Sequence, residues 1–274
     1  MFVQSTIAKY EVGALLAETT AYRVYLCQEV ESGLQYLLQI ASSVEQSGKL
    51  DKASFALGKL KTIAAEYETL HAEQGGTRLL SYERLFPMLI DSFVPERQGG
   101  RRVNILGFSE VDDVKTLVPL SNLTAKDHQR IDLRSSAWIL GRLLKLLGMT
   151  HSEGISVNML SGANVLIEPS RHFAVVFDWS SAETHPEQHV PRKNRVEDVA
   201  NAAKAVFIAL GGDPLTADYP YVRETDDNDR RYIALVTRIM QQRESSAERA
   251  HQQLYGLIDD IYGRKFHPFT PMPL

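Results

Sequence analysis

Cysteine is almost absent from this chain of 274 residues, which contains only Cys27. A single cysteine excludes an intramolecular disulfide and is typical of a reducing compartment, so we expect a cytoplasmic protein. Long apolar runs are also absent, and none approaches the roughly 18 residues needed to cross a bilayer. The first ten residues lack the basic and then apolar order of a secretory signal. We therefore expect no membrane span.

Positive charge is scarce too, because 30 Lys and Arg stand against 34 Asp and Glu, for a net charge of −4. A nucleic-acid-binding domain usually has a basic surface, so we expect no nucleic-acid partner. What the chain does contain is 44% apolar and 23% charged residues. That composition is typical of a globular protein with one large domain or two lobes.

The apolar pattern predicts strands first and helices later. Alternating apolar positions predict five strands, at residues 10–16, 22–29, 34–41, 85–94 and 102–108. Helical spacing predicts helices at residues 50–72, 132–151, 195–210, 229–242 and 247–262. The aromatic segment Tyr262–Thr270 is expected to pack on the helical part, because a disordered tail rarely carries so many aromatic residues.

The stretch Thr150–Ala182 carries the most informative motif. Asn164 opens a short apolar strand, and Asp178 ends a second strand fourteen residues later. Two oxygen-bearing side chains at such points can be aimed at one metal ion. This spacing resembles the catalytic core of protein kinases, in which a loop of the type H-R-D-x-x-x-x-N leads to D-F-G. Asn164 matches the loop Asn, and Asp178-Trp179-Ser180 matches D-F-G.

The resemblance implies an α+β, protein-kinase-like fold with two lobes. A five-stranded antiparallel N-lobe with one helix would cover residues 1–108, and a mainly helical C-lobe would cover residues 109–274. The H-R-D triplet falls on Val157-Asn158-Met159, so Met159 holds the position of the residue that accepts the substrate proton. A thioether cannot act as a general base. The chain thus resembles a bacterial pseudokinase, a degenerate Ser/Thr protein kinase domain.

The positions that the resemblance assigns to the nucleotide phosphates are degenerate as well. The three glycines of G-x-G-x-x-G fall on Ala17, Thr19 and Tyr22, and Glu18 adds a negative charge beside them. Glycine is needed there because backbone N–H groups must approach phosphate oxygens closely. The turn therefore lacks the glycine cradle of a kinase.

The adenine and lysine positions differ from the kinase pattern in a similar way. Gln39 stands where V-A-x-K places the phosphate-binding Lys, and Leu37 stands where a small Ala packs on adenine. Leu37 is expected to intrude into the adenine slot, which Val24 and Leu166 would flank. Glu66 matches the helix glutamate that pairs with the lysine in kinases. Since Gln39 is neutral, that ion pair cannot form, and Glu66 either bonds Gln39 or is solvated.

Asn164 and Asp178 remain as candidate metal ligands. Both offer oxygen atoms, which suit a hard cation such as Mg²⁺. The alternative is that Asp178 caps the hairpin and Asn164 orders the loop backbone, because short polar side chains readily bond nearby backbone groups.

The resemblance also implies structural roles for several other positions. The resemblance implies an apolar column that contains Leu70, Val157 and Trp179. It also assigns Asp198, near the start of a helix, to hydrogen bonds with the backbone of the loop that matches the catalytic loop.

Two further constellations are weaker. His185 and His189 are four residues apart, a spacing that can hold a metal on a helix, but Pro186 between them disfavours a helix. Near His151, the candidate nucleophiles are Ser152, Ser156 and Ser161, but no G-x-S-x-G elbow and no placed acid support one.

These features predict a catalytically inactive pseudokinase that acts as a protein-binding or regulatory module, with another protein as its partner and no cofactor. The alternative is an atypical transferase that binds ATP with Mg²⁺ or Mn²⁺ through Asn164 and Asp178 and moves a phosphoryl or nucleotidyl group. If the nucleotide binds turned around, Glu66, Gln39 and Glu18 become candidate catalytic groups. A small-molecule kinase related to antibiotic kinases is disfavoured, because those enzymes also need the loop Asp.

Overall fold

The structure is a computed structural model. The chain forms two compact units. Unit 1 comprises Met1–Leu117 together with Phe177–Ala182, and unit 2 comprises Val118–Val176 and Glu183–Leu274. The structure describes residues 1–73, 81–95, 99–158, 160–186, 189–221, 227–242, 244–263 and 265–274. Unit 1 thus extends beyond residue 108, the predicted end of the N-lobe, and it includes the segment that contains Asp178.

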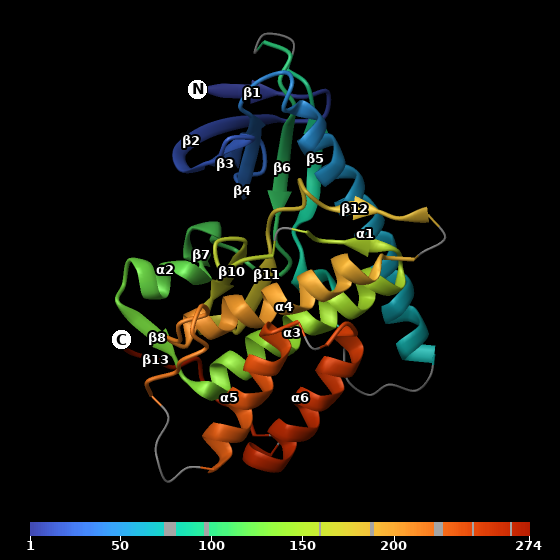
Figure 1. Ribbon diagram of the computed structural model, residues 1–274. Coiled ribbons are helices and arrows are strands. Elements are labelled where there is room, and N and C mark those ends of the chain that lie inside the picture. Colours follow the sequence, from blue (N-terminus) through green and yellow to red (C-terminus); the bar gives the residue numbers. More distant parts are fainter. Residues whose placement is uncertain are drawn as a thin grey trace. The chain divides into compact units, whose positions relative to one another are not determined.

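Unit 1 is built on one antiparallel sheet with a long helix beside it (Figure 1). The strand order is β1-β2-β3-β4-β6-β5. Its elements are β1 (Phe2–Gln4), β2 (Lys9–Glu18), β3 (Tyr22–Glu29), β4 (Gln35–Ala41), α1 (Ser47–Glu73), a 3₁₀ turn (Glu83–Leu85), β5 (Met88–Phe93), β6 (Val103–Gly107) and a 3₁₀ turn (Val114–Thr116). The structure adds β1 to the five predicted strands, since three residues with only Val3 buried give too little alternation to be recognised.

The sheet of unit 1 buries side chains on both faces. On the face toward α1, Asn104 donates from Nδ2 to the carbonyl of Leu50 at 3.0 Å. Its Oδ1 accepts hydrogen bonds from the hydroxyls of Ser54 and Ser92, at 3.0 and 2.8 Å. The opposite face carries an apolar cluster of buried residues, namely Val3, Tyr10, Val12, Cys27, Leu38, Ile40, Val103 and Ile105. Because side chains are buried on both faces, the central strands carry continuous apolar runs.

Helix α1 packs on the sheet with only its first five turns. Its buried residues recur at helical spacing from Leu50 to Ala64. Leu70, two turns further on, is 53% exposed. The prediction that Leu70 belongs to a buried apolar column was therefore wrong, because the end of α1 extends past the part that the sheet covers. Val157 and Trp179, the other two predicted members, are each buried.

Unit 2 is mainly helical. Its helices are α2 (Leu120–Ala125), α3 (Leu133–Ser152), α4 (Arg192–Ala209), α5 (Asp227–Met240) and α6 (Ala247–Tyr262). Short strands complete it, namely β7 (Val118–Pro119), β8 (Gln129–Ile131), β9 (Ile155–Ser156), β10 (Val165–Glu168), β11 (Phe173–Val176), β12 (Glu183–Thr184) and β13 (Pro271–Pro273), with a 3₁₀ turn at Pro169–Arg171. Helix α3 packs against both α4 and α6 and forms the centre of the unit.

Helix α3 begins directly after a capping residue, Asp132. The carboxylate of Asp132 accepts the N–H of Ser135 at 2.7 Å, and this bond satisfies a donor at the helix start. Most of the α3 side chains that follow are buried. The predicted helix over residues 132–151 is confirmed within a residue at each end.

The C-terminal segment packs on unit 2, as its aromatic content predicted. Strand β13 pairs with β8, and the ring of Phe266 stacks on His172 with centroids 4.8 Å apart.

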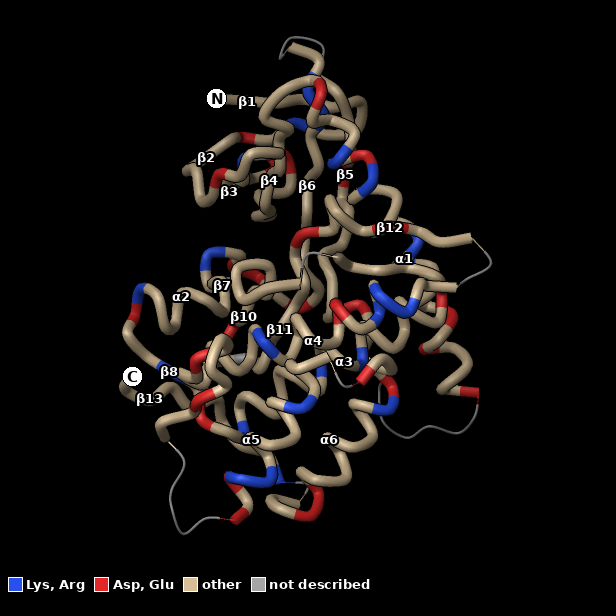
Figure 2. The backbone as a smooth tube through the Cα atoms, in the orientation of Figure 1, with Lys and Arg blue, Asp and Glu red and all other residues tan. Residues whose placement is uncertain are grey.

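Acidic and basic residues are interspersed along α5 and α6 (Figure 2). None of the helices in the described part of the chain is long and apolar enough to cross a membrane.

Candidate functional site

The turn between β2 and β3 is closed on itself. The hydroxyl oxygen of Thr19 accepts the N–H groups of Ala21 and Tyr22, at 3.2 and 3.0 Å. The N–H of Thr19 itself bonds the carbonyl of Tyr22 at 2.9 Å. A phosphate cradle needs backbone N–H groups that point at a ligand. In this turn, three of those groups already have partners within the turn.

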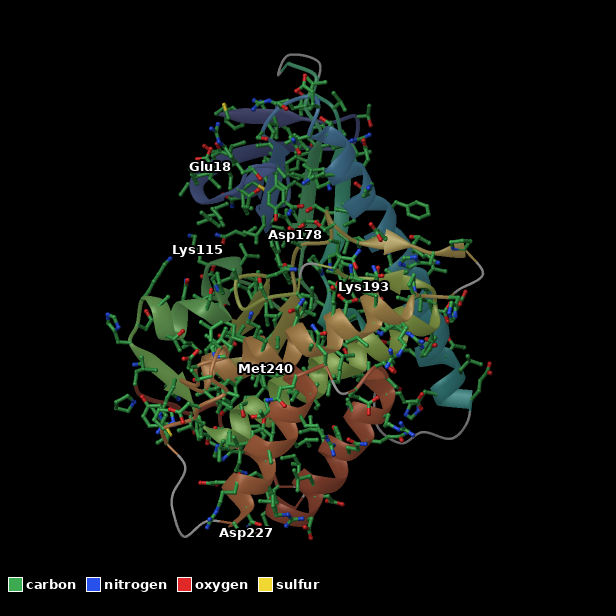
Figure 3. All side chains as sticks on the ribbon, in the orientation of Figure 1. Glu18, Lys115, Asp178, Lys193, Asp227 and Met240 are labelled. Carbon is green, nitrogen blue, oxygen red and sulfur yellow. The ribbon has the colours of Figure 1, made fainter. Side chains whose placement is uncertain are left out.

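The same turn carries an ion pair in place of glycines. Ala17 is exposed on β2 and pairs with Val24 of β3. Next to it, a Glu18 carboxylate oxygen lies 2.7 Å from Nε of Arg23. Figure 3 labels Glu18 at the end of β2. The negative charge that the sequence predicted beside the phosphates is therefore paired with a cation, and its effect on a phosphate stays a prediction.

Tyr22 and Asp178 are joined within unit 1. The Tyr22 side chain is buried, and its hydroxyl interacts with the Asp178 carboxylate. Burial raises the pKa of Tyr22 above its usual range, and the charge and hydrogen bond of Asp178 raise it further. Asp178, labelled in Figure 3, also accepts the N–H of Ser180 at 2.8 Å. The acid that the sequence assigned to a metal thus already interacts with a phenol and a backbone amide.

Gln39 lies on the same face of the sheet as Asn104, the face toward α1. The register places it opposite Val24 on β3 and Asn104 on β6, while Leu37 lies opposite Leu106. Gln39 is 1% exposed, and its Nε2 atom has no hydrogen-bond partner among the described residues. An unsatisfied buried donor is costly, so Gln39 is either an energetic weak point or a donor for a ligand.

Two other predicted slot residues belong to other elements than Gln39. Glu66 is exposed on α1, in agreement with the solvated alternative. Leu166 is 7% exposed on β10 in unit 2. Its predicted place beside an adenine slot stays a prediction.

In unit 2, Asp198 of α4 holds the loop that follows β9. Its carboxylate is fully buried and accepts the N–H groups of Val157 and Asn158, at 2.9 and 2.8 Å. It also bonds Nε2 of His151 at 3.0 Å. Asn158 has a φ of +63°, a backbone conformation that Asn tolerates better than most residues, and its side-chain oxygen accepts Nδ2 of Asn194 at 3.0 Å. The predicted structural role of Asp198 is confirmed.

The metal hypothesis pairs a residue of unit 2 with one of unit 1. Asn164 is 7% exposed, and its N–H bonds the carbonyl of Ser161 at 3.0 Å in the turn before β10. Its pairing with Asp178 around a cation stays a prediction. The described residues contain no group of three or more His, Cys, Asp or Glu side chains that could hold a metal. Met159, the predicted base position, lies outside the described residues.

His185 has a structural contact instead of a metal partner. Its Nε2 lies 2.9 Å from the hydroxyl oxygen of Ser156. Its backbone N–H donates to the carbonyl of Gly154 at 2.7 Å. Ser156 is fully buried, which is unsuitable for a nucleophile that must reach a substrate. His189 is exposed.

Comparison with known proteins bears on the fold. No protein-family model matches the sequence, and no curated protein matches it. Among solved structures, that of vaccinia related kinase 3 superimposes with a TM-score of 0.65 over 95% of this chain and 90% of that chain, at 12% sequence identity. The chain has a protein-kinase-like fold. At this identity the likeness concerns the fold alone.

Two features of unit 1 could not be recognised from the sequence. The contact between Tyr22 and Asp178 joins positions far apart in the chain, so no local pattern could indicate it. The buried network around Asn104 had one signal, a polar residue inside the apolar strand Val103–Gly107.

Proposed function

We propose that the chain is a catalytically inactive kinase-like module, a pseudokinase, that acts by binding or regulating another protein. The observation that carries this proposal is the surroundings of Asp178, whose carboxylate interacts with the buried Tyr22 hydroxyl and accepts the N–H of Ser180 at 2.8 Å. Phosphoryl transfer on a kinase-like fold depends on metal ions that neutralise the phosphate charge. With a phenol and a backbone amide interacting with it, the Asp178 carboxylate is a poor metal ligand.

Two further observations support inactivity. The N–H groups of Thr19, Ala21 and Tyr22 are bonded within their own turn, so they do not form a phosphate cradle. Gln39 supplies no positive charge at the position of the kinase lysine. Each of these differences from a kinase would weaken ATP binding. Together they favour a kinase-like fold that does not turn over ATP.

The binding role is inferred from what the chain retains. Asp198 still fixes the loop after β9 through two backbone bonds, so this part of the scaffold is kept without the phosphate-binding groups. That combination suits a protein used for its shape. A cytoplasmic location and a bacterial source belong to the same proposal, and they rest on the single cysteine and on the resemblance.

A thermal shift assay with ATP tests inactivity, run without metal, with Mg²⁺ and with Mn²⁺. A ligand at one hundred times its Kd would stabilise the fold by about 2.7 kcal/mol, which is readily seen as a rise in Tm. We expect no shift and no transfer of labelled γ-phosphate. A metal-dependent shift that Asp178→Ala abolishes would overturn the proposal.

The binding role needs a separate test. Crosslinking in cells followed by mass spectrometry should identify a reproducible protein partner. Asp178→Ala should retain that partner, because the proposed role uses no metal. Loss of the partner in this variant, with folding intact, would contradict the binding role as proposed.

One observation favours the second candidate, an ATP- and metal-dependent transferase that uses Asn164 and Asp178. The buried Nε2 of Gln39 has no partner among the described residues, and a nucleotide oxygen could supply one. If that is its role, an ATP-dependent shift in Tm must disappear in Gln39→Leu. If no nucleotide shifts the Tm of the wild-type protein, this candidate is excluded.

A further inference from the structure

Helix α1 carries opposite charges in its two halves. The first half is basic, with four lysines against one aspartate, and the second half contains three glutamates and neither lysine nor arginine. The dipole of a helix favours acidic residues near its N-terminus and basic residues near its C-terminus. The order in α1 is the reverse, so it does not serve the stability of the helix itself. The separated charges therefore point to a contact outside the helix.

An exposed stripe connects the two halves of α1. Every third or fourth residue from Lys52 through Phe55 and Thr62 to Glu73 lies on one side of the helix, opposite the buried side that packs on the sheet. Phe55 is 64% exposed, and Leu70, near the C-terminal end of the same stripe, is 53% exposed. Two large apolar side chains are thus accessible on one side of the helix, one in its basic half and one in its acidic half.

The charges at the two ends of this stripe are available to another molecule. Neither Lys52 nor Glu73 makes an ion pair with a described residue, whereas Asp51, the one acid of the first half, pairs with Arg102. Within α1, neither Lys52 nor Glu73 has a residue of opposite charge three or four positions away. Both side chains are exposed.

The stripe is complementary to itself when it is turned end for end. The midpoint between Lys52 and Glu73 along α1 is also the midpoint between Phe55 and Leu70. An antiparallel pair of α1 helices with its two-fold axis at this midpoint brings Lys52 of one copy to Glu73 of the other, and Phe55 to Leu70. Each contact occurs twice because the pair is symmetric. A parallel pair would instead place Lys52 against Lys52 and Glu73 against Glu73.

We propose that the exposed side of α1 is an interface between two copies of this chain, which pack their α1 helices antiparallel. Charge complementarity identifies the second copy as the occupant. A helix of 27 residues is about 40 Å long, so a contact about 10 Å wide buries roughly 400 Å² on each copy. Stable interfaces bury about 1,200–2,000 Å² in total, so this dimer is weak and reversible. The interface uses neither Asp178 nor the turn at Thr19, so it does not depend on the proposed function.

Sedimentation equilibrium of the full chain at increasing concentration tests the proposal. We expect a reversible equilibrium of monomer and dimer with a Kd of about 1–100 μM. Lys52→Glu and Glu73→Lys should each raise this Kd about tenfold, since each change replaces two attractive contacts by two repulsive ones. A mixture of the two variants should form dimers with the wild-type Kd. In the mixed dimer the new glutamate faces the new lysine, and the native pair forms at the other contact.

Two further variants separate charge from apolar contact. Lys61→Glu makes the same charge change on the same helix, but Lys61 lies six residues after Phe55, which turns it about 120° away from the stripe. This control should leave the Kd unchanged. Phe55→Ala changes no charge and should raise the Kd about tenfold through the loss of apolar contact. Circular dichroism should show that all the variants fold, because the replaced side chains are exposed.

The outcomes that would overturn the proposal are distinct. A wild-type chain that stays monomeric at about 200 μM excludes the dimer, and a dimer whose Kd neither charge variant changes uses another surface. Weakening by both variants without recovery in their mixture excludes the antiparallel pairing. A monomeric chain that loses a crosslinked cellular partner in Phe55→Ala would show instead that a different protein occupies this side of α1.

Discussion

The hydroxyl of Tyr22 and the carboxylate of Asp178 interact within unit 1, and the carboxylate raises the pKa of the buried phenol. The sequence resemblance assigns Tyr22 to the position of the third glycine in the kinase phosphate loop, and Asp178 to that of the metal-binding acid of D-F-G. If that match holds, Tyr22 has two effects. It takes the place of a glycine of the cradle, and it supplies a donor that competes with a cation for the acid.

Replacing Tyr22 by Phe should destabilise the fold. The variant keeps the ring but leaves Asp178 without the phenol, and hydrogen bonds to charged groups contribute about 1.5–3 kcal/mol. Urea unfolding should show a loss of this order. The control is Tyr36→Phe, which removes a hydroxyl from a half-buried ring of the same sheet. Equal losses in the two variants would mean that the interaction with Asp178 contributes nothing particular.

Replacing Gln39 by Leu should stabilise the fold. Leucine has a similar size, and the change removes a buried N–H donor that has no partner among the described residues. Leaving such a donor unsatisfied costs about 1–3 kcal/mol, so the free energy of unfolding should rise by about 1 kcal/mol or more. Gln4→Leu, at an exposed glutamine of the same sheet, should change it by less than about 0.5 kcal/mol. A destabilised Gln39→Leu would show that Gln39 makes a favourable interaction.

Restoring the two most obvious missing residues should not restore catalysis. The double variant Met159→Asp and Gln39→Lys supplies a base and a cation, but Tyr22 still interacts with Asp178 and Thr19 still closes the turn. Transfer of labelled γ-phosphate should stay at the background level of the wild-type protein. Measurable turnover of ATP would contradict the view that these contacts close the nucleotide site.

Cys27 should make the fold sensitive to alkali. Burial raises the pKa of its thiol to about 12 from the ordinary value of 9.0. The folded state therefore holds the proton more tightly than the unfolded state, and the resulting stability is complete below pH 9.0 and declines as the pH rises toward about 12.

Urea midpoints at about pH 8 and about pH 10 test this effect, because buried tyrosines begin to contribute only above the ordinary tyrosine pKa of about 10. Cys27→Ala should lose less stability over this interval than the wild-type protein. Because the side chain is 1% exposed, the native thiol should also react slowly with iodoacetamide. Parallel pH dependence in the two proteins would exclude this account of Cys27.

Local patterns predicted the regular elements well. Helix α3 was placed within a residue at each end, because its apolar spacing is broad and Asp132 marks its start. The role of Asp198 was also predicted, although it came from the resemblance rather than from any pattern in the sequence. Strand β1 was missed because its pairing with β2, and not its own composition, defines it.

The contacts that decide the site could not be predicted in this way. The contact between Tyr22 and Asp178 depends on which distant segment lies against β3, and sequence spacing carries no such information. The prediction for Leu70 failed for a related reason. Helical periodicity shows which face of α1 is apolar, but it does not show where along its length the sheet stops covering that face.

The buried carboxylate of Asp198 has a consequence for the order of folding. It lies about forty residues downstream of the loop at Val157 and Asn158 whose N–H groups it accepts. Until α4 has been synthesised and docked, those two donors lack the Asp198 carboxylate, so the loop cannot adopt its native conformation. In nascent chains that end before α4, the loop should therefore be exposed to proteases.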